Sequence, residues 1–219
     1  MTATEAPKTL NKNGRSLKYV WIGVIEKEHL LIELETPRVV RILVEKATFD
    51  EGGLTVGTVL ELIDARDDFI LDNARPELLL ADDFFFSRKT LPKRRFMKTL
   101  KRLAISSTEP SPWRHGASTS YALFDGSTPS VCIVELANKV ALFKNGRDGE
   151  NHVGFKWYGI FQSFPLSRTL DSSLKLELTD RATNKKMIKR ALGFYPIYAV
   201  VAYTLPKNGY CQKIIVALF

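Results

Sequence analysis

Eight basic residues and no acidic residue lie among the fifteen residues from Arg88 to Arg102. The whole chain has 32 Lys and Arg against 24 Asp and Glu, a formal net charge of +8, so without these eight cations the two signs would balance at 24 each. Concentrated cations are typical of a polyanion-binding surface, because bound phosphates release their counterions. The residues that we expect to contact phosphate here are Arg88, Lys89, Lys93, Arg94, Arg95, Lys98, Lys101 and Arg102.

The apolar residues of this segment predict an amphipathic helix over residues 92–104. Phe96, Leu100 and Leu103 recur at the spacing of one helix face, Pro92 suits a first helical turn, and Thr90 could cap it. A merely solvated helix usually mixes charge signs to form i,i+4 pairs, whereas this one has no acid. We therefore interpret it as a helix docked on a core, with its cations held in fixed positions. The alternative is that the cations pair with the acidic residues between 64 and 83.

A second basic helix is predicted over residues 180–192. Thr179 or Asp180 could cap its start, and Gly193 is typical of a helix end. Lys and Arg at helix spacing can neutralise several phosphates along a backbone. The residues that we expect to do so are Lys185, Lys186, Lys189 and Arg190.

An aromatic run in the second half is predicted to lie in one long strand, residues 153–164. Side chains alternate between the two faces of a strand, and we expect Phe155 and Phe161 to face the core. An aromatic ring on the other face, next to a lysine, would stack on an unpaired base of a single strand. The candidates for nucleic-acid contact in this run are Lys156 together with either Trp157 or Tyr158.

Enzymatic motifs are sparse. Asp125, Glu135 and Lys139 resemble the two carboxylates and the lysine of a metal-dependent nuclease, but a gap of four residues through Asn138 separates Glu135 from Lys139, twice the usual spacing. The glycine-rich run 145–149 lacks the Gly-Lys-Ser/Thr of a phosphate loop. The chain has no CxxC and only three scattered histidines. We therefore expect no catalytic residues, no metal and no cofactor, and a nuclease is the weakest functional alternative.

The composition is typical of a folded protein, with 219 residues, 45% apolar and 11% aromatic. Residues 1–16 lack the apolar core of a signal peptide, and no apolar run reaches the roughly 18 residues of a membrane helix. Cys132 and Cys211 lie in apolar runs, as buried thiols do. The sequence therefore predicts a soluble, intracellular protein without a membrane partner, in the cytoplasm or, in a eukaryote, the nucleus.

The predicted fold class is α+β and β-rich. Residues 1–87 contain ten Lys and Arg against sixteen Asp and Glu, whereas residues 88–219 contain twenty-two against eight. Short apolar runs at 17–25, 29–35, 39–44 and 56–63 indicate a small antiparallel barrel or sandwich, OB-like or SH3-like by pattern. The second half predicts an antiparallel sheet with one helix; its strands would lie at 121–124, 131–136, 140–143, 153–164, 174–178, 197–205 and 211–219.

Four segments follow from this division. We expect a flexible N-terminal arm (1–16), an acidic β domain ending in the basic helix (17–105), a Pro- and Ser-rich linker (106–120) and a basic α+β domain (121–219). These features favour a non-enzymatic nucleic-acid-binding protein that contacts the phosphate backbone through basic helices. They leave DNA or RNA, and single or double strands, open. The alternative is a structural or assembly subunit that self-associates or binds a protein partner through its opposite-signed halves, with the acidic N-terminal half as the possible contact surface.

Overall fold

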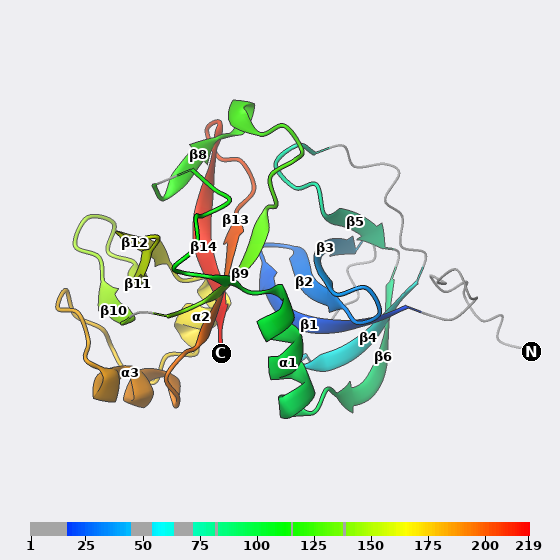
Figure 1. Ribbon diagram of the computed structural model, residues 1–219, viewed down its shortest axis with the longest axis horizontal. Helices are drawn as coiled ribbons and strands as arrows, with labels where there is room; N and C mark the ends of the chain where they lie inside the picture. Colours follow the sequence, from blue (N-terminus) through cyan, green and yellow to red (C-terminus); the bar gives the residue numbers. More distant parts are fainter. Residues whose placement is uncertain (1–16, 45–53, 64–71, 82, 115, 138) are drawn as a thin grey trace, which may run out of the picture. The chain divides into compact units, whose positions relative to one another are not determined.

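The computed structural model describes residues 17–44, 54–63, 72–81, 83–114, 116–137 and 139–219, with the backbone alone at residue 63 and over 83–88. The fold is α+β and rich in strands, as predicted. The chain divides into two compact units, Met1–Leu103 and Ala104–Phe219 (Figure 1). The expected N-terminal arm, residues 1–16, lies outside the described residues.

The first unit, in its described residues, is built on a six-stranded sheet with the strand order β5-β3-β2-β1-β4-β6. Neighbouring strands are antiparallel except β3 and β5, which are parallel. Strands β1 to β4 correspond to the four apolar runs of the sequence, and β5 and β6 extend the sheet at its two edges. The bounds are β1 (Lys18–Ile25), β2 (Glu28–Glu33), β3 (Arg38–Val44), β4 (Thr58–Ile63), β5 (Leu78–Ala81) and β6 (Asp83–Thr90).

The sheet of the first unit buries polar as well as apolar side chains. Tyr19, Leu31 and Leu60 belong to its hydrophobic cluster. Glu28 and Arg41 lie buried on neighbouring strands, where Arg41 Nε donates to Glu28 Oε2 at 2.8 Å, and Arg75 also pairs with Glu28. The two guanidinium groups supply the hydrogen bonds and opposite charge that this buried carboxylate loses from water.

Helix α1 (Lys93–Leu103) follows β6 and confirms the predicted amphipathic helix. The Leu91 amide donates to the Gly57 carbonyl at 2.8 Å, and the Pro92 carbonyl accepts from the Phe96 amide at 3.0 Å, so the helix begins directly after the proline. Thr90, the expected cap, is instead the last residue of β6. Phe96 and Leu100 are buried, as their spacing predicted.

The second unit contains two sheets in its described residues, one of five strands in the order β7-β9-β13-β14-β8 and one of three in the order β10-β11-β12. An isolated bridge between Leu166 and Ile215 joins the segment after β12 to β14. The strands are β7 (Ile105–Ser106), β8 (Ser118–Ser120), β9 (Val131–Glu135), β10 (Ala141–Lys144), β11 (Asn151–Trp157), β12 (Ile160–Pro165), β13 (Tyr198–Tyr203) and β14 (Tyr210–Leu218). The helices are α2 (Arg168–Ser172) and α3 (Lys185–Leu192), with a 3₁₀ turn at Tyr121–Leu123.

Residues 106–120, expected to form a linker, are built into the second unit. Strand β7 pairs with β9 and β8 pairs with β14, so both ends of the stretch are held in the five-stranded sheet. Between them Trp113 is buried, and its indole Nε1 donates to the Pro129 carbonyl at 2.6 Å. The division between the units falls instead at Leu103–Ala104.

Three other elements of the second unit differ from their predictions. Residues 121–124, predicted as a strand, contain the 3₁₀ turn. Residues 174–178 form no strand, although their side chains alternate in burial as the pattern required. The second basic helix begins at Lys185 rather than at residue 180, because the Asn184 side chain caps it by accepting from the Met187 amide at 3.0 Å.

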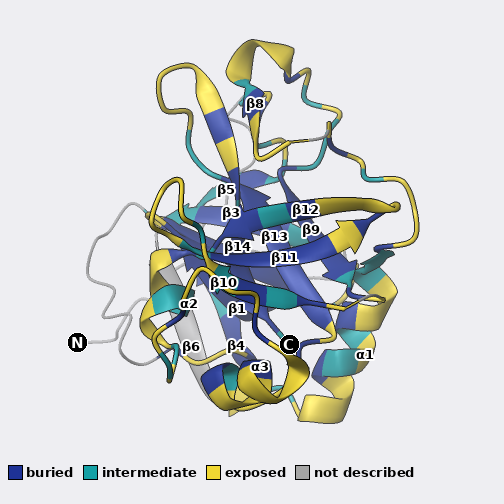
Figure 2. Cartoon of the chain, turned by 90° about the vertical axis from the view of Figure 1, so that its left-hand side faces the viewer, coloured by how far each residue is buried: buried dark blue, intermediate teal, exposed yellow. Residues whose placement is uncertain are grey.

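The predicted strand 153–164 is a hairpin, β11–β12. Tyr158 and Gly159 have φ values of 48° and 78°, two consecutive left-handed residues that form a tight two-residue turn. This turn and the outer surface of α3 are exposed, whereas β13 is buried along its whole length (Figure 2). Cys132 and Cys211 are buried, unbridged thiols. No helix in the described parts of the chain is long and apolar enough to cross a lipid bilayer.

Candidate nucleic-acid interface

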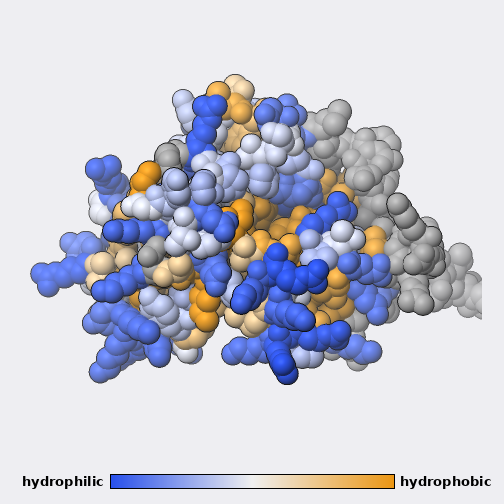
Figure 3. Space-filling model, in the orientation of Figure 1, coloured by the Kyte–Doolittle hydropathy of each residue, from blue (hydrophilic) through white to orange (hydrophobic). Residues whose placement is uncertain are grey.

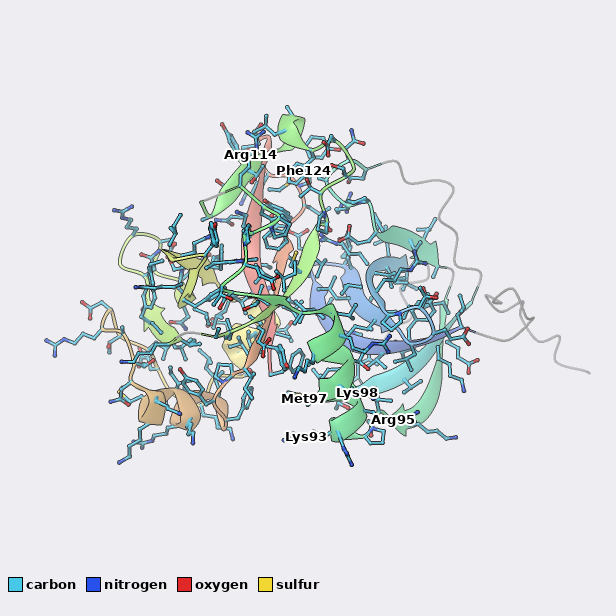
Figure 4. The ribbon with its side chains drawn as sticks, in the orientation of Figure 1. Lys93, Arg95, Met97, Lys98, Arg114 and Phe124 are labelled. Carbon is cyan, nitrogen blue, oxygen red and sulfur yellow. The ribbon has the colours of Figure 1, made fainter. Side chains whose placement is uncertain are left out.

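Helix α1 presents six cations and no acidic residue. At about 100° per residue, five of them lie within an arc of about 120°, opposite the buried Phe96 and Leu100. The six side chains are exposed and make no ion pair with any residue that the structure describes. Figure 4 places Lys93, Arg95 and Lys98 along the helix. The six cations of α1 are Lys93, Arg94, Arg95, Lys98, Lys101 and Arg102.

Helix α3 presents a second set of cations. Lys185, Lys186, Lys189 and Arg190 are exposed, while Ile188 and Ala191 are buried on the opposite side. The helix ends at Gly193, whose φ of 85° suits glycine and whose amide donates to the Lys189 carbonyl at 2.8 Å. These four cations have no acidic partner among the described residues. In Figure 3 strongly hydrophilic side chains project over α1 and over α3.

The N-terminus of α3 is fixed beside strand β10. Thr183 bonds Leu142 through both its amide (3.0 Å) and its hydroxyl (3.2 Å), so the segment before the helix runs along the edge of β10. Lys185 Nζ lies 5.0 Å from the centre of the Tyr195 ring, and the Tyr195 hydroxyl accepts from the Val140 amide at 3.2 Å. The basic helix is therefore held in one register against the three-stranded sheet.

Trp157 does not lie at the surface, so it cannot stack on a ligand base. It is completely buried, and its ring packs against Trp113 at 5.9 Å and Phe155 at 6.1 Å between centroids. The two-residue turn places it at the end of β11, where it points to the same side as Phe155. Tyr158, the other candidate, is 56% exposed at the turn.

Phe161, expected in the core, is instead on the outer face of the hairpin. The turn reverses the chain after Trp157, so Phe161 pairs directly with Lys156 across the two strands. Directly opposite residues of an antiparallel pair project to the same face, and both of these are exposed. The alternation predicted for a single continuous strand placed Lys156 and Phe161 on opposite faces, and the turn puts them together.

A cleft of about 440 Å³ lies at this outer face. Its two charged lining residues, Lys139 and Lys156, are both cations. The remaining lining residues are Val140, Ala141, Phe161 and Thr183. Sequence reasoning missed the cleft because its walls come from three separate segments.

Two of the predicted cations lie just before α1. Lys89 is an exposed residue of β6, and Arg88 precedes it in the same strand, where the backbone alone is described. The acidic residues between 64 and 83 could pair with the cations of residues 88–102. Most of this acidic region, residues 64–71 and 82, lies outside the described residues.

One described group of residues could hold a metal ion, formed by Asp148, Glu150 and His152. Its members already bond one another, since His152 Nε2 lies 3.1 Å from Asp148 Oδ2 and Asp148 Oδ1 accepts from the Glu150 amide at 2.9 Å. Asn145 Nδ2 also donates to Asp148 Oδ2 at 2.9 Å. These contacts close the turn between β10 and β11.

The carboxylates considered for a nuclease lie near opposite ends of β13, a strand to which neither belongs. Asp125 follows Phe124, whose ring packs against Tyr203 at 4.9 Å, whereas Glu135 is paired with Tyr198. Tyr198 and Tyr203 are the two ends of β13, about 16 Å apart at the rise of a strand. Asp125 also accepts bonds from the Ser127 amide and hydroxyl, which close its own turn. The geometry provides no shared metal site for the pair.

Comparisons with known proteins identified no relative of this chain. No protein-family model matches the chain, and neither a curated protein nor a solved structure gives a significant match.

Proposed function

We propose that this protein binds nucleic acid without catalysing a reaction, and that its helices α1 and α3 contact the phosphate backbone. One observation carries the proposal: the ten cations of the two helices, six on α1 and four on α3, are all exposed and have no acidic partner among the described residues. Helices that are only solvated gain from i,i+4 pairs of opposite charge, and neither helix contains an acidic residue.

The cations of both helices are held in fixed positions, unlike the cations of a disordered basic tail. Each helix buries an apolar side, and α3 is tied at both ends by Asn184 and Gly193. A bound phosphate backbone therefore meets cations already held in register, which lowers the ordering entropy lost on binding. Contacts of this kind select for charge and spacing rather than for base sequence.

The test is a salt titration of binding to labelled oligonucleotides, single-stranded and duplex, from 50 to 200 mM NaCl. We expect the affinity to fall steeply with salt, because each phosphate contact contributes roughly 0.7 to 0.9 to the logarithmic slope. Neutralising Lys186 and Arg190 on α3 to Gln weakens binding, whereas neutralising Arg168 and Lys207, exposed cations of the same unit, has a smaller effect. Absence of binding at 50 mM NaCl, or equal losses in both variants, contradicts the proposal.

A further inference from the structure

The tip of the β11–β12 hairpin exposes an unusual amount of apolar surface. Tyr158, Ile160 and Phe161 lie within four residues and are 56%, 46% and 56% exposed. Runs of exposed apolar side chains are uncommon on folded domains and mark surfaces that bind a partner. Tyr158 also has a φ of 48°, a conformation that tyrosine rarely adopts. The hairpin thus keeps a large aromatic side chain where asparagine or glycine would fit the turn better.

Gly154 fixes the position of the Phe161 ring. A Cβ atom on Gly154 would lie 2.4 Å from Phe161 Cζ and 3.1 Å from Phe143 Cε1, so both rings rest on the bare backbone of β11. One side of the Phe161 ring is therefore supported, while more than half of the residue remains exposed. A ring held in this way is a stacking platform rather than a freely rotating side chain.

The charges around this ring suit a phosphate. Lys156 is directly opposite Phe161, and Lys139 lines the same cleft. Thr183, another lining residue, lies two residues before Lys185, the first cation of α3. An aromatic platform beside lysines, continuous with a basic helix, is the arrangement by which proteins grip single strands through base stacking and backbone charge. The cleft volume of about 440 Å³ is within the range of sites that hold small ligand groups.

We infer that the outer face of the β10–β12 sheet binds one unpaired nucleotide of a single strand, with its base against Phe161 and its phosphate near Lys156 and Lys139. This inference rests on the proposed function and adds strand selectivity to it. A base inside a duplex is stacked on both sides and cannot reach the ring, whereas an unpaired base can turn outward onto it. Helix α3 then continues the contact along the backbone.

The experiment uses the full-length protein and a fluorescein-labelled 12-nucleotide strand of mixed sequence, prepared as DNA and as RNA; the tighter binder serves as the probe. Phe161→Ala is expected to weaken binding of the single strand by about tenfold, in the range found for single stacked bases, and duplex binding by less than about twofold. Tyr210→Ala is the matched control, because Tyr210 is an aromatic residue of the same unit that is 57% exposed and belongs to β14, outside the β10–β12 sheet. It should change neither affinity.

Two further variants test the geometry independently. Gly154→Ala displaces the Phe161 ring without removing it, so it should also weaken single-strand binding. Lys156→Gln should lower the salt slope by about one for the single strand. A 2-aminopurine base in the strand should be quenched on binding to the wild-type protein and not on binding to Phe161→Ala. Thermal unfolding establishes that each variant is folded.

The outcomes separate the two proposals. If Phe161→Ala and Gly154→Ala bind the single strand as the wild type does, the stacking site is overturned while salt-dependent binding through the helices still stands. If the wild-type protein binds neither strand form at 50 mM NaCl, the proposed function itself fails. Loss of single-strand affinity and of quenching in Phe161→Ala, with duplex binding retained, supports the inference.

Discussion

The indole ring of Trp113 packs edge-on against Trp157, with the ring centroids 5.9 Å apart. Trp113 also lies 5.0 Å from Tyr203, and its Nε1 donates to the Pro129 carbonyl. A residue from the stretch expected to be a linker is thus part of the aromatic core of the second unit. This core brings together segments that are far apart in the sequence.

The first prediction is that Trp113→Ala strongly destabilises the second unit. Removing a buried tryptophan leaves a cavity and an unpaired carbonyl at Pro129, and such truncations cost about 3 to 5 kcal/mol. Urea unfolding measures the change. Tyr210→Ala, at an aromatic residue that is 57% exposed, should change stability by no more than about 0.5 kcal/mol. A similar cost for the two variants would show that Trp113 does not anchor the core.

The error at residues 106–120 has a physical cause. Pro, Ser and Thr in this stretch are the residues of loops, and their composition carries no information about a tryptophan docking on distant strands. Conversely, α1 was predicted almost to its ends because its apolar spacing is strong and local. Local periodicity determines whether a helix forms, while a buried loop depends on contacts with residues far away in the chain.

The hairpin illustrates a second limit of sequence reasoning. Alternation over residues 153–164 fits a strand, and a Tyr-Gly pair is a weaker turn signal than Asn-Gly, the pair found at 208–209 between the antiparallel strands β13 and β14. Missing the turn reversed the faces of every residue after it, so Phe161 was assigned to the core. Lys156 and the cations of α1 and α3 could be found from the sequence, whereas Lys139 was considered only for a nuclease, and the aromatic platform was not found.

A second prediction concerns pH and Lys213, which is 1% exposed and donates to the carbonyls of Arg114 and Gly116. Burial lowers the pKa of Lys213 to about 8 from its usual 10.5. Between these values the unfolded state binds more protons than the folded state, so stability due to this group rises with pH. Urea unfolding at pH 7.5 and 9.5 should show this gain in the wild type and not in Lys213→Met. If the free energy of unfolding depends on pH equally in the wild type and in Lys213→Met, the prediction is contradicted.

A third prediction addresses the buried ion cluster of the first unit. Glu28→Gln removes the carboxylate that forms an ion pair with the buried Arg41, and breaking a buried ion pair in this way typically costs about 3 to 5 kcal/mol. Arg41→Met should also be destabilising. In the double variant Glu28→Gln with Arg41→Met the two costs should not add, because Arg41→Met removes the buried guanidinium that Glu28→Gln affects. Additive costs in a double-mutant cycle measured by denaturation would mean that the pair is not coupled.

A fourth prediction is that Tyr158→Asn raises the stability of the protein and lowers its affinity for a single strand. Asn adopts the left-handed conformation of this turn more readily than Tyr, so Tyr158→Asn should raise the free energy of unfolding by up to about 1 kcal/mol. The same change removes an exposed ring beside the proposed stacking site, and single-strand affinity should fall about fivefold. Unfolding and anisotropy measurements on one preparation give both values. A gain in stability with unchanged affinity would exclude Tyr158 from the interface.

The last prediction distinguishes the contribution of α1 to binding from that of α3, because the salt slope reports how many phosphates the α1 cations contact. Lys98→Gln with Lys101→Gln removes two exposed cations from the arc of α1. If both contact phosphate, the slope of log affinity against log salt should decrease in magnitude by about two. Lys18→Gln with Lys27→Gln removes two exposed cations of the same unit that lie outside α1 and should leave the slope unchanged. An unchanged slope in the α1 variant would assign backbone binding to α3 alone, because charges that contact no phosphate release no counterions when the complex forms.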